Sequence, residues 1–390
     1  MAGEEKPYRV YRSGRGRGRL PTLPRPWRRR APETPPPGPP GPVPRRRRRR
    51  FGRWFAVALG LFLLFWTAWA LASYFSFRDG VKAANGRLPE PVRAQLSGQD
   101  GLLLTNPTTI LLLGTDTGPG REGSRHSDSI MLVRTDPDHH RVSYLSIPRD
   151  LRVDVPGHGA AKINAAYQIG GPALAVRTVR RLTGLDVDHV VLVDFSRFEE
   201  LIDEIGGIDV DVAEPIHSEP FDCPYDEARC ASWDGWRFEK GRQHMDGRRA
   251  LVYTRVRVNR LDPADNDITR AERQQEVIQA IAGKLASFGT FLRMPFVGGD
   301  LLEPLATDLE PGELLQLGWV YWRSGSGSAL HCRLGGDADS IGGESVIRPN
   351  EDNLGVISMF KGDSAPQPPP PGSGTLGPGC VVGNKKLGSR

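Results

Sequence analysis

The sequence predicts an α/β protein, an α/β sandwich preceded by one membrane-spanning helix. Between residues 107 and 286, apolar runs of strand length alternate with stretches of helical spacing, a pattern typical of sheets covered by helices. Ahead of them, residues 54–77 form 24 positions without a charge, enough to cross a hydrocarbon core roughly 30 Å thick. About 180 residues are ample for one core.

The basic flank of residues 54–77 predicts the orientation of the span. Six arginines occupy residues 45–50, and Arg53 follows them. Arginines resist translocation, so we expect a single-pass protein of the cell membrane with a cytoplasmic N-terminus and an extracytoplasmic main domain. The alternative is a cleaved signal peptide, but its apolar core is usually about 7 to 15 residues long.

The charge of the chain is divided unevenly. Residues 1–53 carry 17 Lys and Arg against three Glu, a net charge of +14, which leaves −8 for residues 54–390 of a chain with net charge +6. This tail is rich in Pro, Arg and Gly and cannot bury enough apolar surface to fold. Retention of the tail in the cytoplasm and attraction to anionic membrane lipid, about 1 kcal/mol per arginine, account for the many arginines without a further partner. We therefore expect no nucleic-acid partner.

The elements follow in order after a polar extracytoplasmic linker, residues 78–106, which contains a short helix around residues 92–96. The first three strands are expected to share one sheet. A C-terminal extension, residues 287–361, is expected to pack on the main domain, and residues 362–390 form a Pro/Gly-rich tail expected to be disordered. The predicted strands are residues 109–114, 129–135, 142–147, 187–194, 208–212 and 250–257, and the predicted helices are residues 173–183, 195–204, 269–285 and 311–321.

Four cysteines all lie on the predicted outer side, where disulfides persist. A Cys223–Cys230 pair is favoured because it closes a short polar loop. The alternative for this pair is zinc ligation, but no second close pair with His spacing accompanies it. The pairing of Cys332 and Cys380 stays open.

Several arginines stand at the ends of apolar strands or in the first turn of a predicted helix, where a buried unpaired guanidinium is costly. Arg255 and Arg257 are two apart, so on a strand they point to one face. Arg270 and Arg273 are three apart, so on a helix they share a side. The full set is Arg149, Arg255, Arg257, Arg270 and Arg273.

Such arginines predict a phosphate or pyrophosphate pocket, because guanidinium groups match phosphate oxygens in pairs and a helix N-terminus adds a positive dipole end. The alternative is a set of structural salt bridges. Their acidic partners would be Asp262, Asp265, Asp267 and Glu272.

Acidic residues at neighbouring strand ends predict a divalent cation. Asp116 follows the first strand, and Asp128 comes just before the second. Two facing carboxylates need a counter-ion, and Mg²⁺ is usually held by one or two carboxylates together with substrate phosphate oxygens. Asp150 is a third candidate. The alternative is that these aspartates cap turns or helices.

Six motifs in order resemble the LytR-CpsA-Psr family, in its actinobacterial form. They cover about residues 107–286, and a looser similarity extends to residue 360. The motifs are LLLGTDT (111–117), SDSIML (127–132), SIPRD (146–150), KINAAY (162–167), DGRRALVYTRVR (246–257) and RAERQQ (270–275).

The resemblance implies a central mixed β-sheet flanked by helices and a Mg²⁺-dependent phosphotransferase, with Mn²⁺ as a possible substitute. Such an enzyme takes a glycopolymer from a polyprenyl (pyro)phosphate carrier in the membrane lipid and joins it to peptidoglycan through a phosphodiester bond, releasing polyprenyl phosphate. Asp116 and Asp128 would hold the metal, and Arg149, Arg255 and Arg257 would act on the phosphates. The general base is unassigned, and Asp150 is a candidate for it. The pyrophosphate site would also include Arg125, Lys162, Arg270, Arg273, Gln274 and Gln275.

The isoprenoid tail of the carrier would need an apolar tunnel. Its candidate wall residues are equally good as ordinary core. They are Leu182, Leu192, Phe195, Phe198, Leu201 and Ile278.

The chain departs from the family at His126, where many members carry arginine. Either Arg125, one position earlier, takes that role, or the site has one fixed charge fewer. Two other functions stay open: a non-catalytic scaffold that binds polyprenyl phosphate or wall polymer, and a lipid pyrophosphatase in which water replaces the sugar hydroxyl. A transcriptional regulator would need a cytoplasmic DNA-binding fold, and residues 1–53 contain none.

Overall fold

The computed structural model describes residues 38, 47–99, 101–115, 127–194, 197–262, 267–285, 287–371, 373 and 376–383. Two units are distinguished, residues 1–59 and residues 60–390, and all that follows concerns the second unit unless stated. One helix begins in the first unit and continues into the second. It is α1, Arg47–Arg87, and its residues from Gly52 onward are long and apolar enough to cross a membrane.

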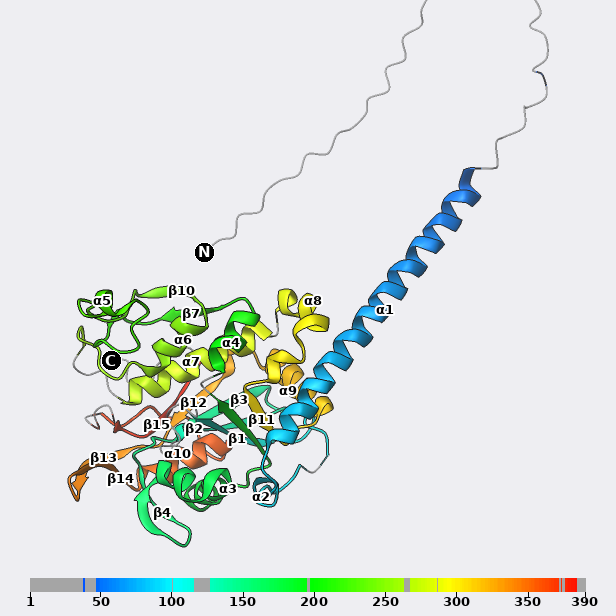
Figure 1. Cartoon of the computed structure of the whole chain (residues 1–390). Helices are drawn as coiled ribbons and strands as arrows, with labels where there is room; N and C mark the ends of the chain where they lie inside the picture. The colour runs from blue at the N-terminus through cyan, green and yellow to red at the C-terminus, as the bar shows by residue number, and fades with distance from the viewer. Residues whose placement is uncertain are drawn as a thin grey trace, which may run out of the picture. The chain divides into compact units, whose positions relative to one another are not determined.

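A seven-stranded mixed sheet forms the centre of the second unit, with the order β11-β6-β1-β2-β3-β12-β15 (Figure 1). Strands β1 and β6 are parallel, β3 and β12 are parallel, and the other neighbouring pairs are antiparallel. The sheet confirms the predicted mixed α/β architecture and places the first three predicted strands side by side. The strands are β1 (Thr109–Thr115), β2 (Ser127–Asp136), β3 (Arg141–Ser146), β6 (His189–Asp194), β11 (Leu305–Thr307), β12 (Leu330–Arg333) and β15 (Gly379–Val382).

Helices cover both faces of this sheet (Figure 1), and the described part of the chain also contains four two-stranded antiparallel ribbons. The remaining helices are α2 (Glu90–Arg93), α3 (Ile163–Thr183), α4 (Phe198–Glu204), α5 (Glu227–Cys230), α6 (Gly247–Arg255), α7 (Asp267–Leu285), α8 (Phe288–Val297), α9 (Pro311–Ser324) and α10 (Asp352–Lys361). The ribbon strands are β4 (Arg152–Val155), β5 (Gly159–Lys162), β7 (Ile208–Val212), β8 (Ile216–His217), β9 (Arg237–Phe238), β10 (Gly241–Met245), β13 (Gly336–Ile341) and β14 (Glu344–Pro349), and two 3₁₀ turns are η1 (Asp300–Leu302) and η2 (Ser326–Ser328).

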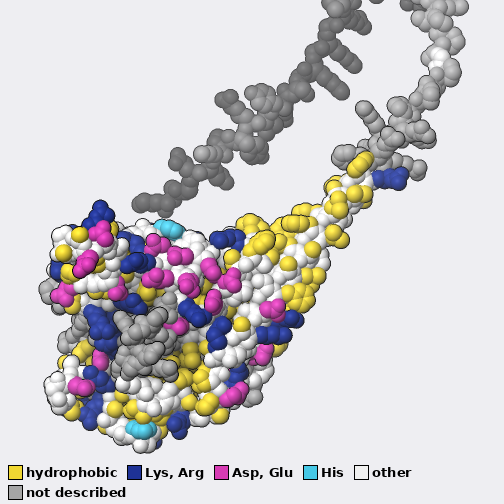
Figure 2. Space-filling view, in the orientation of Figure 1, with side chains coloured by type: hydrophobic (Ala, Val, Ile, Leu, Met, Phe, Trp, Pro, Cys, Tyr) yellow, Lys and Arg dark blue, Asp and Glu magenta, His cyan; other side chains and the backbone are white. Residues whose placement is uncertain are grey.

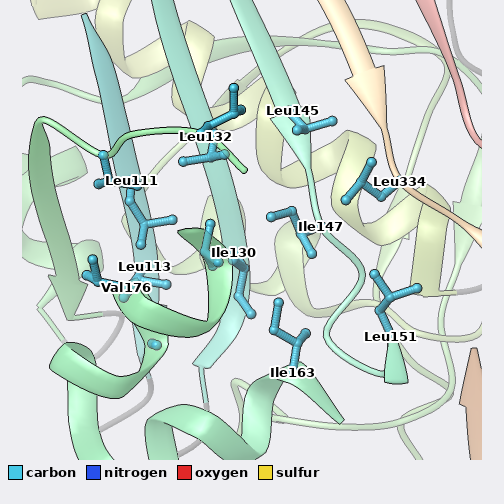
Figure 3. Close-up of a cluster of buried hydrophobic side chains, with 14 of the residues drawn as sticks. Leu111, Leu113, Ile130, Leu132, Leu145, Ile147, Leu151, Ile163, Val176 and Leu334 are labelled. Atoms are coloured by element: carbon cyan, nitrogen blue, oxygen red, sulfur yellow. The ribbon is translucent and has the colours of Figure 1, made fainter. Parts of the chain in front are cut away.

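The largest core lies between α3, α10 and one face of the sheet (Figure 3). Because side chains alternate along a strand, Leu111 and Leu113 of β1 both point into this core and are fully buried. Leu132 of β2 and Leu145 of β3 lie beside them, and Val176 of α3 belongs to the same core. A second core joins α4, β7, β10, α6 and α7. A third, smaller cluster lies on the opposite face of the sheet.

The predicted strand over residues 250–257 is wrong, because α6 occupies this segment up to Arg255. The Asp246 carboxylate accepts a hydrogen bond from the Arg249 N–H at 2.8 Å and caps the helix. Residues 250–254 of this helix are all buried, so no polar face marks the helical period. A short run buried on all sides cannot be distinguished from a strand by its pattern.

The predicted linker (residues 78–106) and the predicted C-terminal tail (residues 362–390) also differ from the predictions. The expected linker begins as helix, since α1 continues to Arg87, and Val81 and Val92 are fully buried in it and in α2. The tail expected to be disordered contains β15, which pairs with β12. Cys380 on β15 forms a disulfide with Cys332, and the predicted Cys223–Cys230 disulfide is confirmed. The boundaries of the predicted domains are otherwise untested.

Candidate functional site

One edge of the sheet collects the carboxyl ends of several strands. Strands β1, β3, β6 and β12 run in the same direction, because β1 is parallel to β6, β3 is parallel to β12, and β2 is antiparallel to both β1 and β3. Ligands of α/β proteins bind outside such carboxyl ends. The antiparallel β2 begins at this same edge, where Ser127 is the cross-strand partner of Thr115. Asp128 therefore lies at this edge, although its side chain is outside the described part of the structure.

Arg149 lies just after β3 and joins a chain of charged groups. Its Nε lies 3.4 Å from Oδ2 of Asp150, and the other oxygen of Asp150 lies 3.2 Å from Nζ of Lys162. Lys162 in turn lies 3.6 Å from Oε2 of Glu344, on the β13–β14 ribbon. All but Glu344 are half-buried, so these pairs are screened less than surface pairs. The motifs SIPRD and KINAAY thus meet through Asp150.

Backbone hydrogen bonds hold this cluster in place. The Asn164 N–H donates to the Arg149 carbonyl at 3.2 Å, and the Ile347 N–H donates to the Asp150 carbonyl at 2.9 Å. Lys162 ends β5 and is the residue before α3. The β4–β5 ribbon, the start of α3 and β14 therefore converge on Arg149 and Asp150.

The first turns of α7 carry the second group of predicted site residues. Arg270, Arg273 and Gln274 are all buried, at 5%, 5% and 8% exposure, which confirms that the two arginines share a side of the helix. Nη2 of Arg273 donates to the Val256 carbonyl at 2.5 Å. This bond joins the DGRRALVYTRVR and RAERQQ motifs. The positive end of the α7 dipole adds to two buried guanidinium groups.

Arg255 and Arg257 do not share a strand face as expected. Arg255 is the last residue of α6 and pairs with Asp222 at 3.2 Å, whereas Arg257 follows the helix and is exposed. Asp222 directly precedes the Cys223–Cys230 disulfide. Arg248, also on α6, donates to the carbonyls of Asp222 and Cys223 at 3.4 and 3.2 Å. The disulfide loop is thus attached to the helix that carries Arg255.

Sequence reasoning missed two residues of this region. Arg333 ends β12 opposite Ser146 of β3, is 2% exposed, and donates from Nη2 to the Gly377 carbonyl at 2.9 Å. It carries the same signal as the predicted arginines, a guanidinium at the end of an apolar strand. Glu344 has no such signal, because it approaches Lys162 only through the fold.

Other predicted site residues are outside the described part of the structure, or are not brought together by it. Asp116, Arg125 and His126 fall within residues 116–126, and the side chain of Gln275 is also undescribed. The candidate tunnel residues are dispersed. Leu182 and Leu192 pack on the main core, Phe198 and Leu201 lie in the second core, Ile278 lies against the third cluster, and Phe195 is undescribed.

A buried aromatic pair lies on the face of the sheet away from the main core. His331 stacks on Tyr144 with ring centroids 5.3 Å apart, and its Nδ1 lies 3.5 Å from Nε2 of Gln279 on α7. Burial lowers the pKa of His331 to about 4 and raises the pKa of Tyr144. His331 is therefore neutral at physiological pH.

The fold and this edge define an α/β protein with basic residues, among them Arg149 and Arg333, at the carboxyl ends of a mixed sheet. The match of residues 76–359 to a family model identifies the family: the chain belongs to the LytR_cpsA_psr family. The match begins within α1 and ends within α10, so it includes the expected linker and the C-terminal extension. The actinobacterial form stays a prediction.

Curated relatives share a substantial part of the chain. This chain is 30% identical over 302 residues to the polyisoprenyl-teichoic acid–peptidoglycan teichoic acid transferase TagU of Enterococcus faecalis (strain ATCC 700802 / V583). The matched region covers 77% of this chain and 93% of that protein. This chain is also 30% identical over 248 residues to the regulatory protein MsrR of Staphylococcus aureus (strain COL), covering 62% of this chain and 68% of that protein.

Solved structures show the same fold. The crystal structure of B. subtilis TagV matches with a TM-score of 0.55 and 29% identity, over 67% of this chain and 99% of that chain. A TagT structure with bound octaprenyl pyrophosphate lipid matches with a TM-score of 0.50 and 26% identity, over 68% of this chain and 93% of that chain.

Proposed function

We propose that this chain is a membrane-anchored phosphotransferase that moves a glycopolymer from a polyprenyl (pyro)phosphate carrier to peptidoglycan. One observation carries the proposal: in a member of this family, Arg149 and Lys162 meet at Asp150 just beyond the carboxyl end of β3, and Arg333 ends the neighbouring strand β12, at the edge where ligands of α/β proteins bind. The relative named as a teichoic acid transferase and the TagT structure with a pyrophosphate lipid support the same substrate class. The span would place the N-terminus in the cytoplasm and the site outside.

The proposed reaction needs no covalent intermediate. A peptidoglycan hydroxyl oxygen attacks the phosphorus that bears the glycopolymer, a new P–O bond forms, and the P–O–P bond to the carrier breaks. Polyprenyl phosphate leaves, and the hydroxyl proton passes to a base or to water. Phosphoryl transfer depends mainly on positioning and charge neutralisation, which the arginines supply.

Asp150 is better suited to orient cations than to accept this proton. Its two carboxylate oxygens lie near Arg149 and Lys162, at 3.4 and 3.2 Å. We therefore assign it the role of positioning these two side chains, and the general base is left unassigned. Mg²⁺ stays part of the proposal. Asp116 and Asp128 would supply hard carboxylate oxygens, the donors that this ion prefers, and the ion would neutralise phosphate charge.

The test uses the full chain in lipid vesicles with Mg²⁺, a polyprenyl-pyrophosphate saccharide and a peptidoglycan oligosaccharide. Ligated product and released lipid phosphate are both measured. We expect Arg149→Ala and Asp128→Ala each to lower ligation by roughly two to three orders of magnitude. Arg181→Ala is the matched control, because this exposed arginine pairs only with Asp154 among the contacts the structure gives it.

The outcomes separate the alternatives. Ligation that needs Mg²⁺ and both side chains establishes the transferase. Lipid phosphate released equally with and without the acceptor would indicate a pyrophosphatase. Binding of the carrier without turnover, unchanged by Asp128→Ala, would indicate a scaffold.

A further inference from the structure

Helix α8 is apolar on its outward face. Phe288, Leu292 and Phe296 are four residues apart, so they share one side of the helix, and Phe288 and Phe296 are 70% and 81% exposed. Arg293 is the one charged residue in the sequence of α8. Exposure of this apolar face to water is unfavourable in free energy.

Helix α9 presents a similar face. Leu315, Trp319 and Trp322 stand at positions i, i+4 and i+7 and are 53%, 52% and 65% exposed. The two indole rings lie 5.0 Å apart. Tryptophan is enriched at membrane–water interfaces, because its ring is apolar and its N–H is polar.

Helix α8 packs against the end of the apolar run of α1, and helix α9 packs against the turns of α1 that follow it. Nε1 of Trp69 donates to the Leu292 carbonyl at 3.3 Å, and Ser76 Oγ accepts from the Gly299 N–H at 3.2 Å. The backbones approach so closely that a Cβ added to Gly80 would lie 2.7 Å from the Gly299 carbonyl oxygen. On α9, Leu314 packs with Val81 and Ala84 of α1. Figure 2 shows hydrophobic side chains continuing from α1 onto the adjoining surface.

These contacts fix the depth of α8 relative to the span. Trp69 precedes Phe77, the end of the apolar run, by about 12 Å of helix at 1.5 Å per residue. If α1 crosses the bilayer along this run, the contact between Trp69 and Leu292 lies inside the outer boundary of the hydrocarbon. Gly299, which follows α8, contacts Ser76, about 1.5 Å from the same end of the run, so α8 would lie between these two depths. That range includes the 5–10 Å by which interfacial helices are buried in the headgroup and acyl boundary.

We infer that α8 and α9 dock the domain on the outer leaflet of the bilayer in which α1 is anchored. The occupant of the apolar faces is lipid, because they are continuous with the surface of the span itself. The exposed guanidinium groups of Arg293 and Arg323 complement anionic headgroups. The inference rests on the proposed membrane anchoring and does not depend on the transferase activity.

The test places single nitroxide labels on the full chain in nanodiscs of phosphatidylethanolamine and phosphatidylglycerol. All four native cysteines are in disulfides, so an added cysteine is the one reactive thiol. The variants are Phe296→Cys, Trp322→Cys and the control Leu354→Cys. Leu354, on α10, is a large apolar residue that is 71% exposed, so it matches Phe296 in polarity and exposure. It differs in location, because α10 covers the face of the sheet that carries the main core.

Accessibility of each label to oxygen and to a water-soluble nickel chelate is measured by electron paramagnetic resonance. We expect labels at 296 and 322 to be accessible to oxygen and protected from nickel by at least several-fold relative to the label at 354. Equal nickel accessibility at all three positions would overturn the inference. Protection of these labels from nickel that appears only in nanodiscs holding two copies of the chain would also overturn the inference. It would indicate that a second copy, and not lipid, covers the apolar faces.

Discussion

The Cys332–Cys380 disulfide gives a quantitative test of what holds the C-terminal strand in the sheet. The two cysteines are separated by 48 residues, whereas Cys223 and Cys230 are separated by 7. In the chain-entropy account, a cross-link destabilises the unfolded state more when the loop is longer. The longer loop gives about 4 kcal/mol and the shorter about 2 kcal/mol at 25 °C.

The perturbation is a pair of double variants, Cys332→Ala/Cys380→Ala and Cys223→Ala/Cys230→Ala. Each removes one cross-link and leaves no free thiol. The assay is urea unfolding of the full chain in detergent micelles, followed by fluorescence under non-oxidising and otherwise identical conditions. We expect the first variant to lose about twice as much free energy of unfolding as the second.

Amide hydrogen exchange on β15 provides the local readout. β15 pairs with β12 over four residues, so without the disulfide its amides should exchange faster than those of β3. Equal losses from the two double variants, or a larger loss from the Cys223–Cys230 pair, would refute the entropic reasoning.

Two further predictions concern stability. Burial holds the pKa of His331 at about 4, against 6.5 in the unfolded chain, so neutral His331 contributes at most about 3 kcal/mol of stability above pH 6.5, and this stability is lost as the pH falls through 4. In His331→Phe, the free energy of unfolding measured between pH 7 and 4 should therefore fall less steeply than in the wild type. Parallel curves for the two proteins would contradict this reasoning. Gly171 has φ 64° and ψ −164° at the kink of α3, and Gly184 has φ 65° and ψ 14° at the C-terminus of this helix. No atom lies within 4 Å of a Cβ added at either position, so the cost of an alanine there comes from the positive φ and not from a clash. Gly171→Ala should therefore lower the free energy of unfolding by about 1–3 kcal/mol and Gly184→Ala by about 1 kcal/mol, as measured by thermal unfolding.

Local hydrophobic patterns predicted most of the central sheet. Strands β1, β2 and β3 contain apolar runs of strand length, and helix α7 has a helical period. All four lie within one or two residues of their predicted bounds. Helix α6 was missed because its buried residues hide the period. Strand β15 was missed because its position depends on β12 and on a disulfide partner far along the chain, and a Pro-rich stretch precedes it.

The site was predictable to the extent that single residues carry a local signal. An arginine at the end of an apolar strand marked Arg149, and the same reasoning would have marked Arg333. Pairings made by the fold had no such signal. The contact of Lys162 with Glu344 joins two ribbons, and the contact of Arg255 with Asp222 joins a helix to a loop; no sequence pattern links either pair.

The helical start of the expected linker changes how the enzyme would meet its substrate. A connector over residues 78–106, fully extended at roughly 3.3 Å per residue, would let the site range over roughly 100 Å above the membrane. Instead, α1 runs on to Arg87, whose guanidinium donates to the carbonyls of Leu302 and Leu305 at 2.6 and 3.0 Å. The domain is thereby tied to α1, and if α1 spans the membrane as proposed, the domain is held at a fixed height. Since a polyprenyl carrier stays in the leaflet, such an attachment would hold the phosphate site within a constant reach of it and reduce the entropy lost on binding.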